Sequence, residues 1–248
     1  MNFSEILLQW YPLNKRELPW RNTHNPYFIW ISEIILQQTK VEQGLPYYLK
    51  FVNVFPTVFD LAIASEDKVL KLWQGLGYYS RARNLHFSAK YIVQYHDGVF
   101  PKFYNDILKL KGVGIYTAAA ISSFSFSLPY AVVDGNVIRV LGRFFGIETP
   151  YDTTLGRKKY QELAQALLDS NNSADNNQAI MEFGAIQCTS KLPKCLSCPF
   201  SNDCVAFNTN CVEKLPVKSK KIKIKKRFLN YLFIQNENAV LLGKRYKG

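Results

Sequence analysis

The chain has 248 residues, enough for one or two domains, and its hydrophobic fraction of 48% is that of a globular protein with a sizeable core. Its formal net charge of +12 favours a polyanionic partner, nucleic acid before an anionic membrane surface. The start of the chain has an acid at Glu5 and no basic stretch, which argues against a secretory signal. We therefore expect a soluble cytoplasmic protein, in which structural disulfides are rare.

Apolar residues recur at three- and four-residue spacing along most of the chain, which predicts an all-α protein. Short Gly, Pro and Asn signals separate the helical segments. We expect helices at 3–11, 27–38, 66–74, 81–95, 104–110, 115–124, 136–145, 155–170 and 175–185.

Glu33 is the single acid of the apolar segment FIWISEIILQQT. At helical spacing its neighbours are Ile29, Trp30, Leu36 and Gln37. Desolvation raises the pKa of a carboxyl group, so Glu33 is a candidate general acid. The simpler alternative is a surface glutamate at the edge of the apolar face.

A Gly-x-Gly turn, Gly112 to Gly114, separates two predicted helices in KLKGVGIYTAAA. Backbone N–H groups at the start of a helix bind anions, helped by the helix dipole. A dinucleotide-binding motif would need a preceding strand and a glycine where Thr117 stands. The pattern instead predicts a helix–hairpin–helix that holds a DNA phosphate without reading sequence, with an ordinary turn as the alternative.

Asp134 lies in AVVDGNVIRVLG, where its simplest role is to cap a helix that begins near Asn136. A helix N-terminus helps to keep a carboxylate ionised, and an ionised aspartate stabilises a developing cation. Glycosidic bond cleavage uses two carboxyl groups, one with a raised pKa and one with an ordinary pKa. Glu33 would be the first of these groups and Asp134 the second.

Four cysteines, Cys188, Cys195, Cys198 and Cys204, follow the spacing C-x6-C-x2-C-x5-C. A [4Fe–4S] cluster tolerates such unequal loops, whereas zinc usually sits between two short C-x2–4-C pairs. The spacing favours the cluster over zinc or a disulfide pair. Cys211 lies outside the pattern, and we expect it to be a free thiol.

Eight Lys or Arg and no acid fall in residues 214–227, which carry two thirds of the net charge. We expect a basic linker at 213–227. The alternation in 228–245 predicts a β hairpin with its turn at 236–238. Because a lone hairpin is marginal in water, we expect 228–248 to be the start of a truncated C-terminal domain.

The segments SEIILQQT, KGVGIYTA and VDGNV and the cysteine spacing together resemble the helix–hairpin–helix DNA glycosylases that carry an iron–sulfur cluster, over about residues 1–227. Within that superfamily LPWR (18–21), QQT (37–39) and MEFGA (181–185) resemble the MutY family of A/G-specific adenine glycosylases. The resemblance implies a two-lobed fold. Residues 22–131 would form a six-helix lobe with the hairpin, and 1–21 with 132–212 the cluster lobe.

The resemblance implies base-excision repair of adenine mispaired with 8-oxoguanine or guanine in double-stranded DNA, by a monomer associated with the nucleoid. Glu33 would protonate adenine and later help to deliver water, and Asp134 would stabilise the oxocarbenium ion or trap it covalently. Asn136 and Tyr116 would orient these groups. In the related endonuclease III family a lysine stands at the position of Tyr116 and cuts the strand through an imine, which tyrosine cannot form.

The resemblance also implies contacts to the flipped base and to the DNA backbone. Glu182 would lie at the base edge, and Gln38 and Tyr78 would wedge into the duplex. The remaining residues are the pocket lining Trp20, Arg21 and Leu36 and the phosphate contacts Gly112, Gly114, Lys191 and Lys194.

Three other functions stay open from the sequence. An endonuclease III-like glycosylase and lyase would act on oxidised pyrimidines, which Tyr116 opposes. A DNA-binding protein without chemistry would gain nothing from two such acids. A small nucleic-acid adaptor would hold zinc at the cysteines in place of an iron–sulfur cluster.

Overall fold

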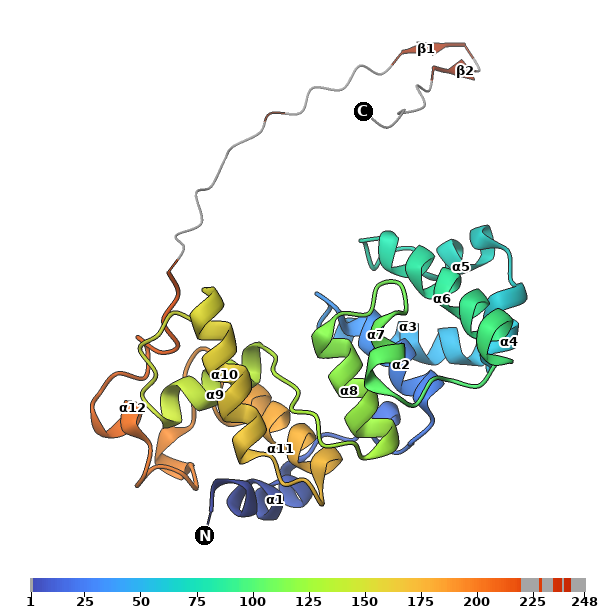
Figure 1. Ribbon diagram of the computed structural model, residues 1–248. Coiled ribbons are helices and arrows are strands. Elements are labelled where there is room, and N and C mark those ends of the chain that lie inside the picture. The colour runs from blue at the N-terminus through green and yellow to red at the C-terminus, as the bar shows by residue number, and fades with distance from the viewer. Residues whose placement is uncertain (1, 220–227, 229–233, 238, 242–248) are drawn as a thin grey trace.

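The computed structural model describes residues 2–219, 228, 234–237 and 239–241, and this part of the chain folds into two helical lobes that lie side by side (Figure 1). Its all-α character confirms the predicted fold class. None of the helices in the described ranges is long and apolar enough to cross a membrane.

The first lobe is built from the middle of the chain. Its helices are α2 (Pro26–Leu36), α3 (Val41–Val54), α4 (Val58–Ile63), α5 (Glu66–Leu72), α6 (Ser80–His96), α7 (Tyr104–Leu108) and α8 (Ile115–Phe126). One hydrophobic cluster runs through all of them, from Tyr27 to Val132, with Trp30 and Trp73 fully buried.

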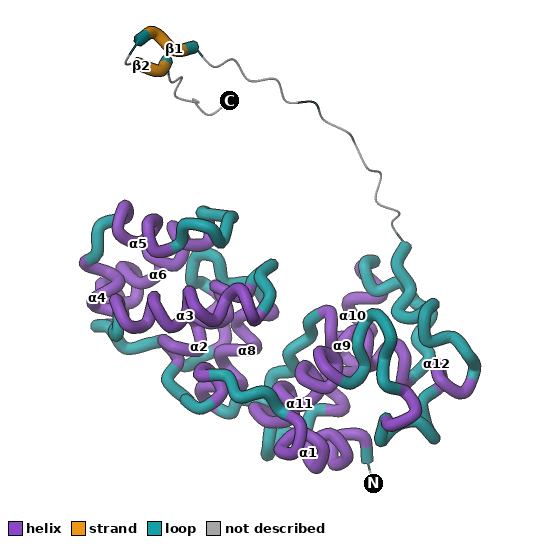
Figure 2. Tube along the Cα trace, turned by 180° about the vertical axis from the view of Figure 1, so that it is seen from behind, coloured by secondary structure: helices purple, strands orange, loops and turns teal. Residues whose placement is uncertain are grey.

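The second lobe combines the start of the chain with the segment that follows α8, and Figure 2 shows it from behind. Its helices are α1 (Phe3–Asn14), α9 (Gly135–Phe144), α10 (Thr154–Leu167), α11 (Ser173–Ile186) and α12 (Val205–Asn208). A separate cluster joins Leu7 and Tyr11 of α1 to Phe183 of α11. The chain therefore crosses between the lobes after α1 and again after α8.

Residues 22–131, all of which the structure describes, hold seven α-helices where six were expected. Helices α3 and α4 were not among the predicted segments. Gly44 and Pro46 stand inside α3, where they would normally interrupt a helix. A Cβ atom at Gly44 would lie 2.8 Å from Leu36 Cδ2, so the glycine allows α3 to pack closely on the end of α2.

Near the end of the described part, the strands β1 (Gln235–Asn236) and β2 (Ala239–Val240) pair antiparallel, with Gln235 opposite Val240. They lie inside the segment predicted as a hairpin. Residues 220–227 of the predicted basic linker and residues 229–233, 238 and 242–248 of the predicted C-terminal segment are outside the described residues.

Candidate active site

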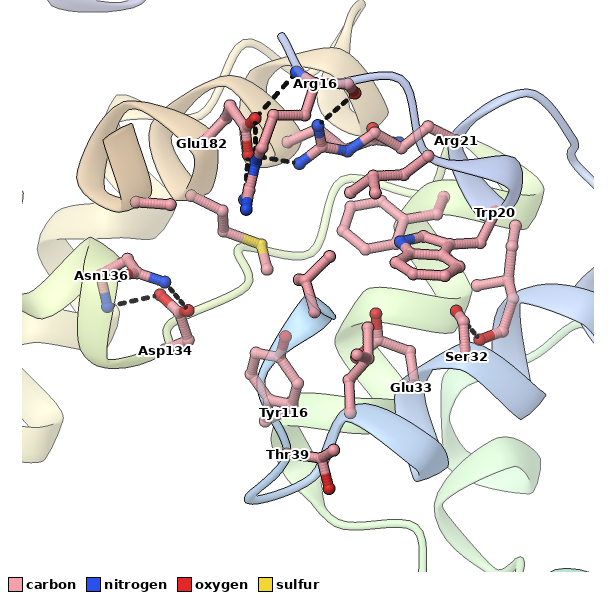
Figure 3. Close-up of a pocket in the computed structure, with 18 residues that line it drawn as sticks. Arg16, Trp20, Arg21, Ser32, Glu33, Thr39, Tyr116, Asp134, Asn136 and Glu182 are labelled. Carbon is pink, nitrogen blue, oxygen red and sulfur yellow. Dashed lines mark hydrogen bonds and ion pairs between the residues drawn. The ribbon is translucent and has the colours of Figure 1, made fainter. Parts of the chain in front are cut away.

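A pocket of about 220 Å³ opens between α2 and α8 of the first lobe and α9 and α11 of the second (Figure 3). The 3-10 turn η1 (Pro19–Arg21) contributes to it from the crossing segment. The structure brings eight of the predicted site residues together in its lining: Trp20, Arg21, Glu33, Leu36, Tyr116, Asp134, Asn136 and Glu182.

Helix α2 places Glu33 in the pocket. Pro26 begins the helix and the Asn25 side chain accepts the N–H of Tyr27, which caps it. Residues on every face of α2 are buried, so the helix is internal and Glu33 is only 8% exposed. This burial excludes the alternative of a surface glutamate.

Burial raises the pKa of Glu33 to about 7. A hydrogen bond with Tyr116 lowers the pKa of Glu33, and the nearby charge of Asp134 raises it. Tyr116 stands at the start of α8, whose run Ala118–Ala120 is fully packed against the core. A carboxyl group with a pKa near 7 holds its proton in a large fraction of molecules at neutral pH, as a general acid requires.

Asp134 is the N-cap of α9, as predicted. Its Oδ1 accepts the backbone N–H groups of Asn136 and Val137, both at 2.8 Å, and its Oδ2 accepts Asn136 Nδ2 at 2.7 Å. Burial nevertheless raises the pKa of Asp134 above its ordinary value, and these hydrogen bonds oppose the rise. The expectation of an ordinary pKa at Asp134 is therefore wrong, because the sequence does not show how deeply the cap is buried.

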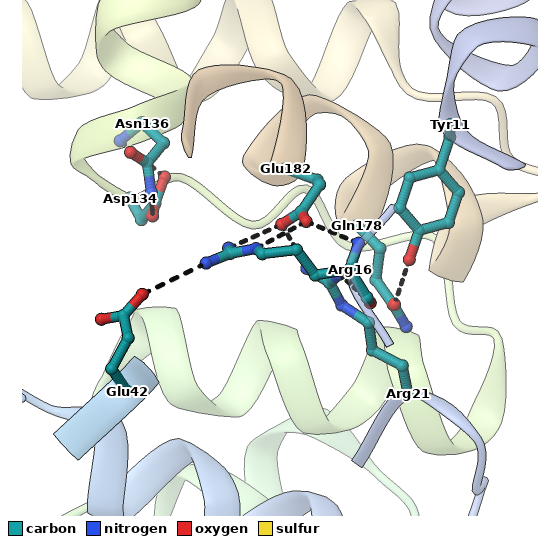
Figure 4. A network of polar contacts seen from close by, with 8 residues as sticks. All are labelled: Tyr11, Arg16, Arg21, Glu42, Asp134, Asn136, Gln178 and Glu182. Carbon is teal, nitrogen blue, oxygen red and sulfur yellow. Dashed lines mark hydrogen bonds and ion pairs between the residues drawn. The ribbon is translucent and has the colours of Figure 1, made fainter. Parts of the chain in front are cut away.

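Glu182 on α11 lines the pocket, and its carboxylate binds two arginines, Arg16 and Arg21 (Figure 4). Oε1 accepts the backbone N–H of Arg16 at 2.9 Å and its Nε at 2.8 Å, and Oε2 accepts Nη2 of Arg16 at 2.8 Å and of Arg21 at 2.7 Å. These four bonds use the acceptor sites of the carboxylate. Burial alone would raise the pKa of Glu182, but the hydrogen bonds from Arg16 and Arg21 lower it to about 2.

Replacing Glu182 with Gln is expected to lower the free energy of unfolding by about 3 kcal/mol, since breaking a buried ion pair leaves uncompensated charge. The pKa of Glu182 is lower in the folded protein than in the unfolded chain. Its contribution is therefore present above the unfolded pKa and lost as the pH falls through about 2.

Urea unfolding at neutral pH measures this difference. Glu162→Gln is the matched control, because Glu162 pairs with Lys158 at 3.7 Å on the exposed face of α10. We expect the control to cost less than about 0.5 kcal/mol. Equal losses in both variants would contradict a structural role for the Glu182 pair.

The hairpin between α7 and α8 confirms the predicted helix–hairpin–helix. Gly112 has φ +85°, and a Cβ atom there would lie 2.9 Å from the Cβ atom of Asn84, so both conformation and space require glycine. Gly114 is the N-cap of α8, without a side-chain cap and without neighbours within 4 Å of an added Cβ atom. The turn can therefore present its backbone to an anion.

Four further predicted residues lie on the surface, outside the pocket lining. Gln38 lies just after α2, and Tyr78 lies just before α6. Both have a left-handed backbone, with φ 57° at Gln38 and φ 46° at Tyr78, and the Tyr78 side chain is 68% exposed. Lys191 and Lys194 are exposed in the cysteine-containing loop of the second lobe.

Cys188, Cys195, Cys198 and Cys204 line a single cavity, and Cys211 does not. None of the five cysteines, all of which lie in the described part of the chain, forms a disulfide. Burial raises the pKa of Cys198 to about 11, and the charges of the other three thiols add to the rise. In the described part of the chain, no three or more His, Cys, Asp or Glu side chains are arranged to hold a single metal ion.

Two arginines of α9 hold this loop, and sequence reasoning missed both. Arg143 Nη1 lies 3.5 Å from Cys188 Sγ and donates to Thr189 O at 2.7 Å. Arg139 donates to Cys188 O at 2.8 Å and to Asn136 Oδ1 at 2.7 Å. Arg139 and Arg143 are four residues apart, so the sequence could have placed both side chains on one face of α9.

Residues 31–167 match the HhH-GPD superfamily of base excision DNA repair proteins. A protein named adenine DNA glycosylase from Buchnera aphidicola subsp. Acyrthosiphon pisum (strain APS) is 38% identical over 243 residues, covering 98% of this chain and 69% of the relative. A human protein of the same name is 42% identical over 213 residues, covering 82% of this chain and 39% of the relative.

Solved structures show the same fold. A thermostable thymine-DNA glycosylase superposes with a TM-score of 0.77 at 31% identity, covering 84% of this chain and 95% of that chain. Endonuclease III in a non-covalent DNA complex superposes with a TM-score of 0.71 at 19% identity, covering 84% and 94%. The endonuclease III likeness concerns the fold alone.

Proposed function

The chain belongs to the HhH-GPD superfamily of base excision DNA repair proteins, and we propose that its pocket receives an adenine flipped out of a mispair with 8-oxoguanine or guanine. Its activity is that of an adenine DNA glycosylase, which hydrolyses the N-glycosidic bond between adenine and deoxyribose. The observation that carries the finer proposal is the pairing of buried Glu33 with capped Asp134 in one pocket.

Glu33 is the general acid of the reaction. Its carboxyl proton goes to N7 of adenine, and the electron pair of the N-glycosidic bond leaves with the base. The resulting carboxylate then takes a proton from water, whose oxygen adds to C1′ of the sugar. The raised pKa of Glu33 and its hydrogen bond to Tyr116 support both halves of this cycle.

Asp134 stabilises the oxocarbenium ion, or traps it covalently at C1′. Its oxygens are held by three donors from Asn136 and Val137, so the carboxylate is oriented before the charge develops. A cation formed beside it favours the ionised form and offsets the effect of burial on the pKa of Asp134. Asn136 and Tyr116 are positioning residues for these two acids.

The strand stays intact after the base is removed. Tyr116 occupies the pocket beside Glu33, and burial holds the pKa of its hydroxyl well above the ordinary value. A protonated phenol neither attacks C1′ nor forms an imine. Among the described residues that line the pocket there is no lysine. This supports a monofunctional enzyme, which removes the base without cutting the strand.

The pocket wall and the surface turns account for DNA binding in this proposal. Trp20 and Leu36 contact the base, and Glu182 acts at the base edge through the guanidinium groups of Arg16 and Arg21. The surface residues with proposed DNA contacts are Gln38 and Tyr78 as wedges and Gly112, Gly114, Lys191 and Lys194 at phosphates. The two hydrophobic clusters support the division into lobes at 22–131 and at 1–21 with 132–212.

We propose that the protein acts as a monomer in the cytoplasm, at the nucleoid. The excess of basic residues supports attraction to DNA without a second subunit. Each of the proposed catalytic groups comes from this one chain.

The family fold implies a [4Fe–4S] cluster, and the donor set fits one. Cys188, Cys195, Cys198 and Cys204 surround one cavity, as the ligands of a cluster do. The cluster would shape the loop that carries Lys191 and would supply no chemistry to base release. Arg139 and Arg143 would then hold that loop against α9.

The purified protein is expected to contain about four iron atoms per chain and to absorb near 400 nm, as a [4Fe–4S] cluster requires. Cys198→Ser is expected to lose both, whereas Cys211→Ser keeps them, since Cys211 lies outside the cavity. Metal analysis and an absorption spectrum of each variant decide this. One zinc atom and no iron would contradict the cluster.

The choice of base is tested with duplexes that carry adenine opposite 8-oxoguanine, guanine, cytosine or thymine, and with thymine opposite guanine. The released bases are separated by chromatography. We expect free adenine from the first two duplexes and none from the pairs with cytosine or thymine. Release of thymine instead would contradict the proposed substrate.

A further inference from the structure

Arg81, the second residue of α6, is a buried cation outside the pocket, only 8% exposed. Its Nη1 donates to the carbonyl oxygens of Ile34 at 3.1 Å, Ile35 at 2.9 Å and Gln37, and to Thr39 Oγ1 at 3.3 Å. The carbonyl groups at the end of a helix lack partners within that helix. Arg81 therefore caps the C-terminal end of α2, where the helix dipole also favours a cation.

The other side of the same guanidinium binds the loop that precedes α6. Nη2 of Arg81 donates to Leu76 O at 3.2 Å and to Gly77 O at 3.4 Å. The guanidinium carbon lies 5.2 Å from the ring centre of Trp73 and 5.7 Å from that of Tyr78. One side chain thus connects two segments that are about forty residues apart in the sequence.

Both segments lead into a residue with left-handed backbone. Gln38 at φ 57° directly follows the bonded carbonyl group of Gln37, and Tyr78 at φ 46° directly follows that of Gly77. Such conformations are costly for residues other than glycine and persist only where the surroundings fix them. The bonds from Arg81 supply that restraint on both sides.

Within the described residues no carboxylate forms an ion pair with Arg81. Burying an unpaired cation is expensive, and an apolar side chain would fill a simple packing position at lower cost. The arrangement therefore favours a role in geometry.

We propose that Arg81 is a positioning residue that fixes Gln38 and Tyr78 relative to each other, so that both enter the duplex as one rigid wedge. This inference rests on the proposed function, in which these two residues occupy the space left by the flipped base. Arg81 itself contacts neither the base nor the sugar.

A double-mutant cycle tests the proposal, with adenine release from an adenine:8-oxoguanine duplex under single-turnover conditions as the readout. Arg81→Met is expected to slow release at least tenfold, and to reduce the fluorescence rise of 2-aminopurine placed at the adenine position. In a Tyr78→Ala background the same change is expected to cost less than threefold, because the wedge is already lost. Arg83→Met is the control, since Arg83 lies on the same helix but pairs with Glu66 on the surface.

Equal fold-losses in both backgrounds would overturn the proposal and indicate a structural role for Arg81 alone. Where Arg81→Met does not fold by circular dichroism, Arg81→Lys takes its place in the cycle, because lysine keeps the charge but cannot bridge both segments. Wild-type protein that releases no adenine would refute the proposed function, and the inference would fall with it. Active wild-type protein with equal losses refutes the inference only.

Discussion

Replacing Glu33 with Gln is expected to lower the single-turnover rate of adenine release by about a thousandfold, within the range of general acid catalysis. Glutamine has nearly the same shape, but its amide is too weak an acid to protonate N7 and too weak a base to take a proton from water. Binding of mispaired DNA is expected to change less than threefold, because the proposed wedge and phosphate contacts lie outside the pocket that Glu33 lines. Rapid-quench kinetics and a binding titration measure the two effects separately.

The pH profile provides the control for this variant. Burial raises the pKa of Glu33 to about 7, so the wild-type rate is expected to fall as the pH rises through that value and the acid form is lost. The residual rate of Glu33→Gln is expected to show no such fall. A variant rate within tenfold of the wild type, or an unchanged profile, would remove Glu33 from the reaction.

Replacing Asp134 with Asn is expected to slow adenine release by about 100- to 1,000-fold, the effect of removing one preorganised electrostatic contact. Asparagine keeps an oxygen that can cap α9 but removes the negative charge beside the oxocarbenium ion. Thr153→Ala is the matched control, because Thr153 caps α10 through Gly156 N at 3.0 Å. Thr153→Ala is expected to lose cap stability and keep activity, whereas Asp134→Asn is expected to keep a cap and lose activity.

Thermal unfolding and single-turnover kinetics on the same preparations separate these effects. Unchanged activity in Asp134→Asn would mean that Asp134 serves only as a helix cap. A large loss of activity in Thr153→Ala would mean that loss of a helix cap by itself impairs the enzyme.

Local patterns in the sequence predict much of this site. Glu33 is a candidate because it is the one acid in a mainly apolar helix, although the sequence left a surface position open, and Asp134 because an aspartate before a helical segment caps it. The helical hairpin is predicted from Gly112 and Gly114. Turns and helix caps depend mainly on neighbouring residues, so a short sequence pattern is enough to identify them.

Contacts between distant segments could not be predicted. Arg16 and Arg21 reach Glu182 from more than 160 residues away, and Arg81 joins two loops that share no sequence pattern. The raised pKa of Asp134 depends on how deeply its carboxyl group is buried, which the cap motif does not reveal. Helix α3 was missed because Gly44 and Pro46 oppose helix formation locally, while packing on α2 stabilises it.

The measurement that tests the central claim most directly uses an end-labelled duplex with adenine opposite 8-oxoguanine. The duplex is incubated with the protein and analysed with and without hot alkali. We predict strand breaks at the adenine position only after alkali, because Tyr116 cannot replace a lysine and the base is removed from an intact strand. Breaks that form without alkali, together with a protein–DNA adduct trapped by borohydride, would contradict the account.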